Sequence, residues 1–241
     1  LLADLGADVI KVENPKGGDD SRKFGPPYVK DENGDETSES AYFLACNRNK
    51  RSVTLDLRNP KGAEIVKQLL KNCDAMVHNF KVGGLEKYGL GYEDIKDEFP
   101  ALVYCAISGY GQTGPYKDRG GYDMQAQGMA GIMAITGEPD GQPMKVGIGI
   151  ADMMCGMYAA PAILAALRHR DATGDGQFID LSLLDTTVAW LNYVGLSYLT
   201  SGEPSARYGN GHPNIVPWEV FPSKDGHFVL TVGNDGQFKA F

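Results

Sequence analysis

The sequence lacks the residues and patterns that several protein classes require. Its 241 residues include only four cysteines and four histidines, with no Cys-x-x-Cys pair and no spacing typical of zinc ligands, so we expect reduced thiols and no metal site. No apolar run approaches the ~20 residues of a membrane helix, and no basic-then-apolar signal peptide opens the chain. These absences predict a cytoplasmic protein that does not bind a membrane.

Three common catalytic motifs are absent or incomplete. The chain contains neither the G-x-x-x-x-G-K-[ST] pattern of P-loop enzymes nor the G-x-S-x-G pattern of α/β-hydrolases. A dinucleotide-binding pattern begins at Gly147 and Gly149, but Asp152 replaces its third glycine. Because a carboxylate there would repel a pyrophosphate, a nicotinamide-dependent dehydrogenase is also disfavoured.

The charge is predominantly acidic, with one basic stretch. The net charge is −8 and 42% of the residues are hydrophobic, which is typical of globular proteins and argues against nucleic acid as a partner. Residues 47–87 nevertheless carry nine Lys and Arg against four Asp and Glu, a local net charge of +5. This stretch predicts a binding site for an anionic small molecule, although Lys67 and Lys71 fit an ordinary solvated helix face better.

Strands and helices alternate at intervals of about thirty residues, which predicts an α/β fold with a Rossmann-like parallel sheet. The region 14–39 is rich in Gly, Pro, Asp and Glu and is expected to be a long loop. The expected strands are residues 8–13, 52–57, 75–78, 102–107 and 177–182. The expected helices are residues 40–46, 61–72, 83–88, 92–98, 123–134, 153–168 and 183–200, and the helix over 153–168 is apolar on nearly every face and expected to be buried.

The domain organisation follows from the change of pattern near residue 200. Residues 1–200 are expected to form a large domain without its usual first strand, and residues 201–215 a linker. Residues 216–241, with a hairpin around Lys224-Asp225-Gly226, begin a smaller α+β domain. The opening Leu1-Leu2 and the barely begun helix after residue 234 predict a fragment of a longer protein.

A lone aspartate marks the start of the long apolar helix. Asp152 follows Gly147 and Gly149, and this glycine-dense stretch lets a ligand approach the backbone closely. At the N-cap or in the first turn, free backbone N–H groups and the helix dipole would stabilise the ionised form. A dry, ionised carboxylate suits a nucleophile or a proton-transfer base, whereas a plain helix cap is the alternative.

The whole chain resembles the class III CoA-transferases, the CaiB/BaiF family that includes formyl-CoA transferase. Dicarboxylate- and oxalate-type enzymes and the glutarate type look most similar. The segments that carry the resemblance are GADVIKVE (6–13), GDDSRKFGPP (18–27), NRNKRSVTLDLRNPKG (47–62), HNFKVGGLEKYGL (78–90), SGYGQTGP (108–115), GYD (121–123), VGIGIADMMCG (146–156) and GDGQFIDLSL (174–183).

The resemblance implies an activity. Asp152 would attack an acyl-CoA thioester and pass through a mixed anhydride and an aspartyl-CoA thioester, from which a carboxylic acid takes the CoA. No cofactor is implied beyond coenzyme A, which enters as the acyl-CoA substrate. The full-length protein would be an interlocked homodimer.

The resemblance also places the CoA contacts on matching positions of this chain. Asn14 stands where family members often carry Arg, and Lys87 likewise replaces an Arg. The contacts implied are Leu55, Asp56, Leu57, Arg58, Asn79, Phe80, Lys81, Lys87, Gly121, Tyr122 and Asp123.

Two other functions compete with CoA transfer. An acyl-CoA racemase or epimerase of the same superfamily uses a His 30 residues before the Asp, where this chain has Tyr122. A tyrosine hydroxyl, with an ordinary pKa of ~10, is a poor base at neutral pH, so transfer is favoured. A non-catalytic CoA-binding protein would have lost the nucleophile, but Asp152 is present. The glycine-rich stretch Gly209–His212 is expected to be either a mobile lid or an ordinary linker.

Overall fold

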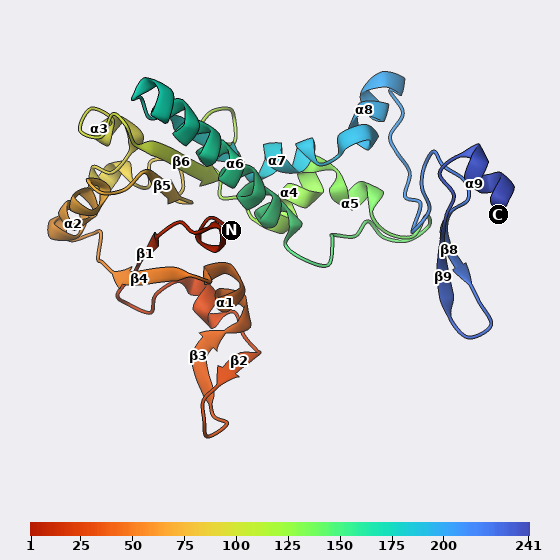
Figure 1. The fold of residues 1–241 in the computed structure, drawn as a ribbon, viewed down its shortest axis with the longest axis horizontal. Helices are drawn as coiled ribbons and strands as arrows, with labels where there is room; N and C mark the ends of the chain where they lie inside the picture. Colours follow the sequence, from red (N-terminus) through yellow and green to blue (C-terminus); the bar gives the residue numbers. More distant parts are fainter. The chain divides into compact units, whose positions relative to one another are not determined.

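The computed structural model describes all 241 residues and divides into two compact units, each built from two stretches of the chain. The first unit comprises Leu1–Ala106 and Met157–Asp180, and the second comprises Ile107–Gly156 and Leu181–Phe241. Figure 1 labels the elements of both units. The division into a large domain up to residue 200 and a smaller domain from residue 216 remains a prediction.

Parallel strands form the framework of the first unit. β1 (Val9–Glu13) pairs in parallel with β4 (Lys50–Thr54), and β5 (Ala75–His78) pairs in parallel with β6 (Val103–Ser108). β7 (Phe178–Ser182) runs parallel to β6 on its other edge and completes a three-stranded sheet. The predicted α/β fold class with a parallel sheet is confirmed.

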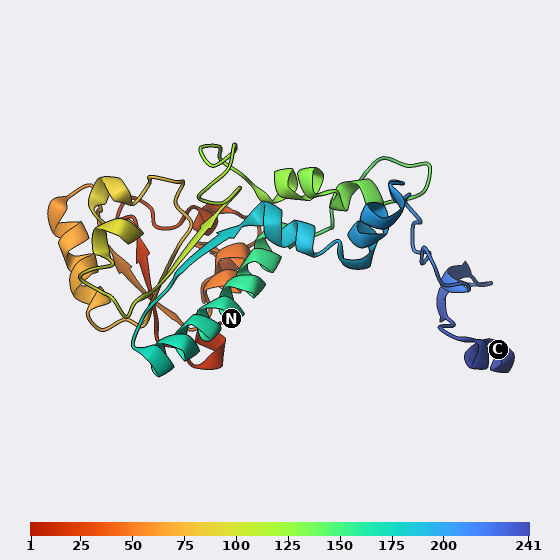
Figure 2. The ribbon, with the colours of Figure 1, turned by 90° about the horizontal axis from the view of Figure 1, so that it is seen from above.

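α2 (Pro60–Leu70) covers this framework because apolar residues recur along one of its faces. Asn59 caps the helix through its Oδ1, which accepts a hydrogen bond from the Lys61 N–H over 3.0 Å. Figure 2 shows α2 running along one side of the strands. The short elements η3 (Glu86–Tyr88) and α3 (Tyr92–Ile95) contribute to the same core. Its buried members are Ala63, Val66, Leu70, Leu85, Leu90, Ile95, Leu102, Tyr104 and Ala106.

A β-hairpin occupies part of the region 14–39 that was predicted to be one long loop, so that prediction is wrong for the strand residues 28–30 and 36–39. β2 (Tyr28–Lys30) and β3 (Glu36–Ser40) pair antiparallel, after the short helix η2 (Asp20–Lys23) and before α1 (Ala41–Asn47). Polar composition hid the strands, although the Asn33-Gly34 dipeptide is a strong hairpin signal. Gly34 has a φ of +88°, the left-handed conformation that such a turn requires.

Two helices predicted as continuous in the second unit are each divided. α4 (Asp123–Ala130) ends at Gly131, whose φ of +98° is left-handed, and α5 (Ile132–Ile135) follows it. α7 (Leu183–Ala189) is separated from α8 (Asn192–Ser201) by a turn, and Asn192 has a φ of +47°. The apolar pattern of the sequence continues across both breaks and does not reveal them. A single residue in the left-handed region is enough to redirect the chain there.

The longest helix, α6 (Ile150–Thr173), extends beyond the predicted 153–168 at both ends and runs continuously through Pro161. Its predicted complete burial is wrong: Ala151, Cys155 and Ile163 are buried, but Met153 and Leu164 are about half exposed. An 18-residue window of this helix has a mean hydropathy of 1.6, which by length and composition alone is enough to cross a membrane. Core helices of globular proteins meet the same criterion.

The ends of the chain hold the remaining elements. η1 (Ala3–Leu5) ends at Gly6, in the left-handed conformation expected of a helix C-terminus. β8 (Trp218–Pro222) and β9 (His227–Thr231) form the predicted antiparallel hairpin. α9 (Asp235–Ala240) is the predicted short terminal helix, capped by the side chain of Asn234.

Candidate active site

The first turn of α6 carries Asp152, where the sequence predicts the reactive carboxylate. The residue is exposed, so the expectation of a dry carboxylate is wrong in this chain. A methyl group added at Gly147 would meet no atom within 4 Å, so the backbone in front of the helix is also open. A bound substrate could therefore reach the Asp152 side chain directly.

The N–H groups at this end of α6 are capped by a different carboxylate, that of Asp123. Its Oδ1 accepts hydrogen bonds from the N–H groups of Ala151 over 2.7 Å and of Asp152 over 3.3 Å. The prediction that these free N–H groups stabilise the Asp152 carboxylate is therefore wrong. A side chain from the start of α4 satisfies them, and the Asp152 carboxyl remains available for chemistry.

Although Asp152 as a residue is exposed, its carboxyl is partly desolvated, and this raises its pKa above the ordinary value of 3.8; the negative charge of Asp123 makes a smaller contribution in the same direction. A higher proton affinity also makes the ionised carboxylate a better nucleophile. The thiol of Cys155, one turn along α6, does not compete, because burial raises its pKa to about 11. Of these two side chains, Asp152 is therefore the better candidate for the reactive group predicted at this helix end.

A close contact between two glycines fixes the position of the Gly121-Tyr122-Asp123 segment against Gly109. A methyl group built on Gly121 would come within 2.6 Å of the Cα of Gly109, and one on Gly109 within 2.5 Å of the Cα of Gly121. Only glycine fits at either position, and the contact fixes the backbone that enters α4. Tyr122 is 77% exposed beside it, whereas Asp123 is committed to hydrogen bonds with α6 and α4. Of these predicted CoA contacts, only Tyr122 offers a free side chain.

The predicted CoA contacts that follow β4 belong to the first unit. Leu55 and Leu57 are partly buried against its core, so their side chains serve packing. Asp56 and Arg58 form an exposed pair, with the Arg58 Nε 2.8 Å from the Asp56 Oδ1, and Arg58 lowers the pKa of Asp56. The charge of Lys16, which the sequence analysis did not select, also acts on Asp56. Lys16 could have been selected from the sequence, because it lies in the segment that follows β1, the strand that pairs with β4.

The segment after β5 holds three further predicted contacts, Asn79, Phe80 and Lys81, all of them exposed. The N–H of Phe80 donates to the Nδ1 of His78 over 3.2 Å, and burial lowers the pKa of His78 to about 4. His78 is therefore neutral at physiological pH and acts as an acceptor that shapes this segment.

Lys87, the last predicted contact in the first unit, lies in η3. Its Nζ is 4.9 Å from the ring centroid of Tyr88, so its charge lies over the face of that ring. The Lys87 side chain is exposed, and a phosphate group could approach its ammonium group from solvent.

The Gly209–His212 stretch is tied down at several points. The Gly209 N–H donates to the carbonyl of Gly137, and the His212 N–H donates to that of Trp218. The Arg207 guanidinium, just before the stretch, donates to four backbone carbonyls between residues 134 and 141. Whether the stretch acts as a lid remains a hypothesis.

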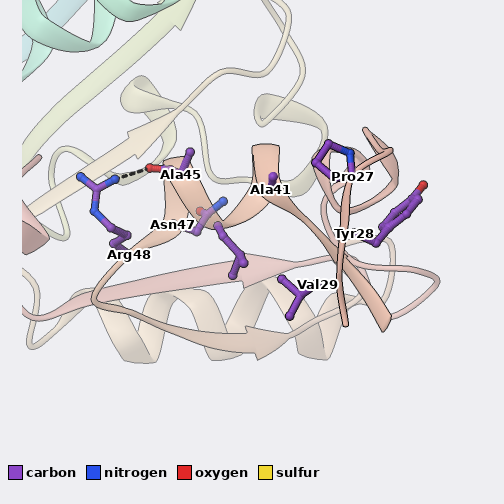
Figure 3. Close-up of a pocket in the computed structure, with 8 residues that line it drawn as sticks. Pro27, Tyr28, Val29, Ala41, Ala45, Asn47 and Arg48 are labelled. Carbon is purple, nitrogen blue, oxygen red and sulfur yellow. Dashed lines mark hydrogen bonds between the residues drawn. The ribbon is translucent and has the colours of Figure 1, made fainter. Parts of the chain in front are cut away.

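A pocket of about 510 Å³ lies between α1 and β2 (Figure 3). Its walls are mainly apolar, and the Arg48 guanidinium at its edge already donates to the Ala45 carbonyl and pairs with Asp4. None of the predicted site residues lines it. In addition, no group of three or more His, Cys, Asp and Glu side chains is spaced to hold a metal ion.

Comparisons with known proteins identify the family. The model of "CoA-transferase family III" matches residues 1–241. The chain is 54% identical over 239 residues to a succinate–glutarate CoA-transferase of Agrobacterium fabrum, covering 99% of this chain and 60% of that protein. It is 47% identical over 237 residues to succinyl-CoA:glutarate CoA-transferase of Mus musculus, covering 98% and 53%.

The solved structures agree with the sequence comparisons. A CaiB/BaiF family protein from Brucella suis matches with a TM-score of 0.89 at 50% identity, covering 99% of this chain and 62% of that one. The chain spans only 53–60% of the length of the two relatives named above. The resemblance inferred from the sequence motifs is confirmed, and the chain belongs to CoA-transferase family III.

Proposed function

We propose that the complete protein transfers CoA from an acyl-CoA to a carboxylic acid, with Asp152 as the attacking group. The observation that carries the proposal is an exposed carboxylate in the first turn of α6 whose neighbouring N–H groups are capped by Asp123. The similar proteins carry the names of transferases that act between succinate and glutarate or their CoA esters. We therefore infer dicarboxylic acids and their CoA thioesters as the substrates.

The first half of the reaction loads CoA onto the protein. An Asp152 oxygen attacks the thioester carbonyl carbon, the C–S bond breaks, and CoA leaves as a thiolate; a mixed anhydride between Asp152 and the acyl group remains. The thiolate then attacks the Asp152 carbonyl carbon and expels the donor acid as a carboxylate. The product is an aspartyl-CoA thioester on Asp152.

The second half runs the same steps in reverse with another acid. The acceptor carboxylate attacks the aspartyl thioester and releases CoA thiolate, which then attacks the acceptor's acyl carbon and frees the Asp152 carboxylate. Because one thioester replaces another, the exchange is nearly isoenergetic and requires neither ATP nor a metal. The protein's task is to position the reacting carbonyls and to protect the activated ones from water.

Trapping the intermediate tests the proposal. Full-length protein is mixed with a panel of acyl-CoA donors, treated with hydroxylamine and digested, and the peptide that contains Asp152 is weighed by mass spectrometry. We expect a hydroxamate on Asp152 only when an acyl-CoA is present, and strongest with succinyl-CoA or glutaryl-CoA. Absence of the adduct with every donor would refute the transferase assignment.

The lysines predicted to contact CoA provide a separate test. Lys81→Ala and Lys87→Ala are each expected to raise KM for acyl-CoA about two- to fivefold at low salt, because an exposed ion pair with phosphate contributes at most ~1 kcal/mol. The effect shrinks as salt screens the charges. Steady-state kinetics at two ionic strengths measure it, with Lys71→Ala, an exposed lysine at the C-terminus of α2, as the control. An unchanged KM for both variants at low salt would remove these lysines from the CoA site.

A further inference from the structure

Gln127, in the middle of α4, is a polar side chain with no exposed surface. Its Nε2 donates a hydrogen bond to the Oδ2 of Asp123 over 2.6 Å, and its Oε1 accepts one from the N–H of Val146 over 2.9 Å. A buried amide is tolerated when both its nitrogen and its oxygen form hydrogen bonds, as they do here. This side chain therefore serves a specific purpose at its position.

The two hydrogen bonds connect the two parts of the chain that meet at Asp152. Asp123 uses its other oxygen, Oδ1, to hold the N–H groups of Ala151 and Asp152 at the start of α6. Val146 lies at the head of the glycine-dense segment that leads into the same helix end. Gln127 thus holds both the Asp123 carboxylate that caps α6 and Val146, the residue at the start of the segment that leads into α6.

We propose that Gln127 is a positioning residue for CoA transfer, holding Asp123 and the segment before α6 so that the Asp152 carboxylate meets the substrate carbonyl in the reactive geometry. This inference rests on the proposed function. Gln127 acts through Asp123 and Val146 and touches neither Asp152 nor, by its burial, the substrate. Small displacements of a reacting group lower the reaction rate strongly. Substitution of a residue that orients a reactive side chain commonly lowers activity about 10- to 100-fold.

The chemistry of the amide explains why glutamine is required. One end must donate to a carboxylate and the other must accept from an N–H, and a neutral amide offers both. Leucine offers neither, and an ionised carboxyl cannot donate and would face Asp123 with like charge. A protonated carboxyl, however, has the same donor and acceptor arrangement as the amide. The Gln127→Glu variant is therefore expected to work only in its protonated form.

The decisive experiment compares Gln127→Leu and Gln127→Glu in the full-length protein. We expect Gln127→Leu to lower kcat about 10- to 100-fold at every pH and to change KM for acyl-CoA less than twofold. For Gln127→Glu, the ratio of its kcat to that of the wild type should rise as the pH falls. The carboxylate in direct contact with the introduced carboxyl is that of Asp123, and its charge raises the pKa of that carboxyl by repulsion. The other charged groups on the neighbouring segments are Asp185 on α7, which packs against α4, Lys145 beside Val146, and Asp152 on α6.

A stability control separates positioning from folding. Thr187 is buried in α7, which packs against α4, and its Oγ1 donates to the Leu183 carbonyl over 2.6 Å rather than to Asp123. Thr187→Val should lower Tm but leave kcat near the wild-type value. Acid rescue of Gln127→Glu is a readout that a purely structural role would not produce.

The results distinguish the two proposals from each other. If the wild type forms the Asp152 hydroxamate and Gln127→Leu transfers CoA at the wild-type rate, the role of Gln127 is refuted and the proposed function stands. A Gln127→Glu to wild-type ratio that is independent of pH also refutes that role. If the wild type forms no adduct with any donor, the proposed function fails, and the role of Gln127 fails with it.

Discussion

Replacing Asp152 by alanine is expected to abolish CoA transfer, with kcat falling at least ~10⁴-fold, because the reaction then has no group to carry the acyl and CoA intermediates. CoA binding should change little, since the predicted CoA contacts of the first unit are not altered. Transfer is followed by mass spectrometry of the acyl-CoA product, and binding by calorimetry with CoA.

The same substitution is expected to leave the fold at least as stable as the wild type at pH 7. The structure assigns the capping of α6 to Asp123, so removal of Asp152 costs no cap. A carboxyl whose pKa is raised in the folded state opposes folding when it is ionised, above that raised pKa. The cost disappears as the pH falls below the ordinary value of 3.8, so any gain in Tm should narrow with acidification.

Asp185 provides a matched control for this prediction. It is also an exposed aspartate in the first turn of a helix, α7, where Ser182 provides the cap. Asp185→Ala should retain transfer, which shows that loss of activity is specific to Asp152. Transfer by Asp152→Ala at a rate near the wild type would instead rule out the aspartyl intermediate.

The candidate aspartate and its place in the first turn of a helix could be predicted from the sequence, but its surroundings could not. Two glycines and an acidic residue ahead of an apolar helix pointed to Asp152 in the first turn, and the family motifs pointed to the same residue. The cap that frees Asp152 comes from Asp123, 28 residues before Ala151 in the chain. No local pattern encodes such a pairing, because it depends on how α4 packs against the start of α6. The hydrogen bonds of Gln127 could not be predicted from the sequence for the same reason.

The strands, too, could be predicted from the sequence only in part. Strands of the parallel sheet were predictable because their β-branched residues lie between clear breakers, as in residues 8–13 and 75–78. The β2–β3 hairpin was missed because polar residues dominate it, and its stability comes partly from its turn. There the Oδ1 of Asp31 accepts from the N–H groups of Asn33 and Asp35. Composition indicated a loop, whereas turn chemistry determined a hairpin.

Replacing Arg22 by alanine is expected to destabilise the fold by about 3–5 kcal/mol, since it leaves a buried carboxylate without its partner. The Glu13 side chain at the end of β1 is 1% exposed, and the Arg22 Nε lies 2.9 Å from its Oε2. The Arg22 Nη2 lies 2.9 Å from the Glu13 Oε1, and Ser52 in β4 donates to that same oxygen. Arg22 also pairs with Glu39 and stacks over the Phe43 ring.

This network has a defined pH dependence. Hydrogen bonds from Arg22, and then from Ser52 and the Asp19 backbone, lower the pKa of Glu13 from 4.5 to about 2 against the opposing effect of burial. A carboxyl with a lowered pKa in the folded state contributes stability above its unfolded pKa, and that contribution is lost as the pH falls from about 4.5 toward 2. Without Arg22, the buried carboxyl prefers its proton. The deficit of Arg22→Ala should therefore be largest near neutral pH and shrink toward pH 3.

Arg51 supplies the matched control, because it makes a similar ion pair in water. Its guanidinium donates to both oxygens of Asp8, but the two side chains are 66% and 70% exposed. Arg51→Ala should cost less than ~1 kcal/mol at any pH. Urea unfolding of both variants at pH 7 and pH 3.5 measures the difference. An Arg22→Ala deficit as small as that of Arg51→Ala, or one that grows with acidification, would mean that burial of Glu13 does not require its ion pair.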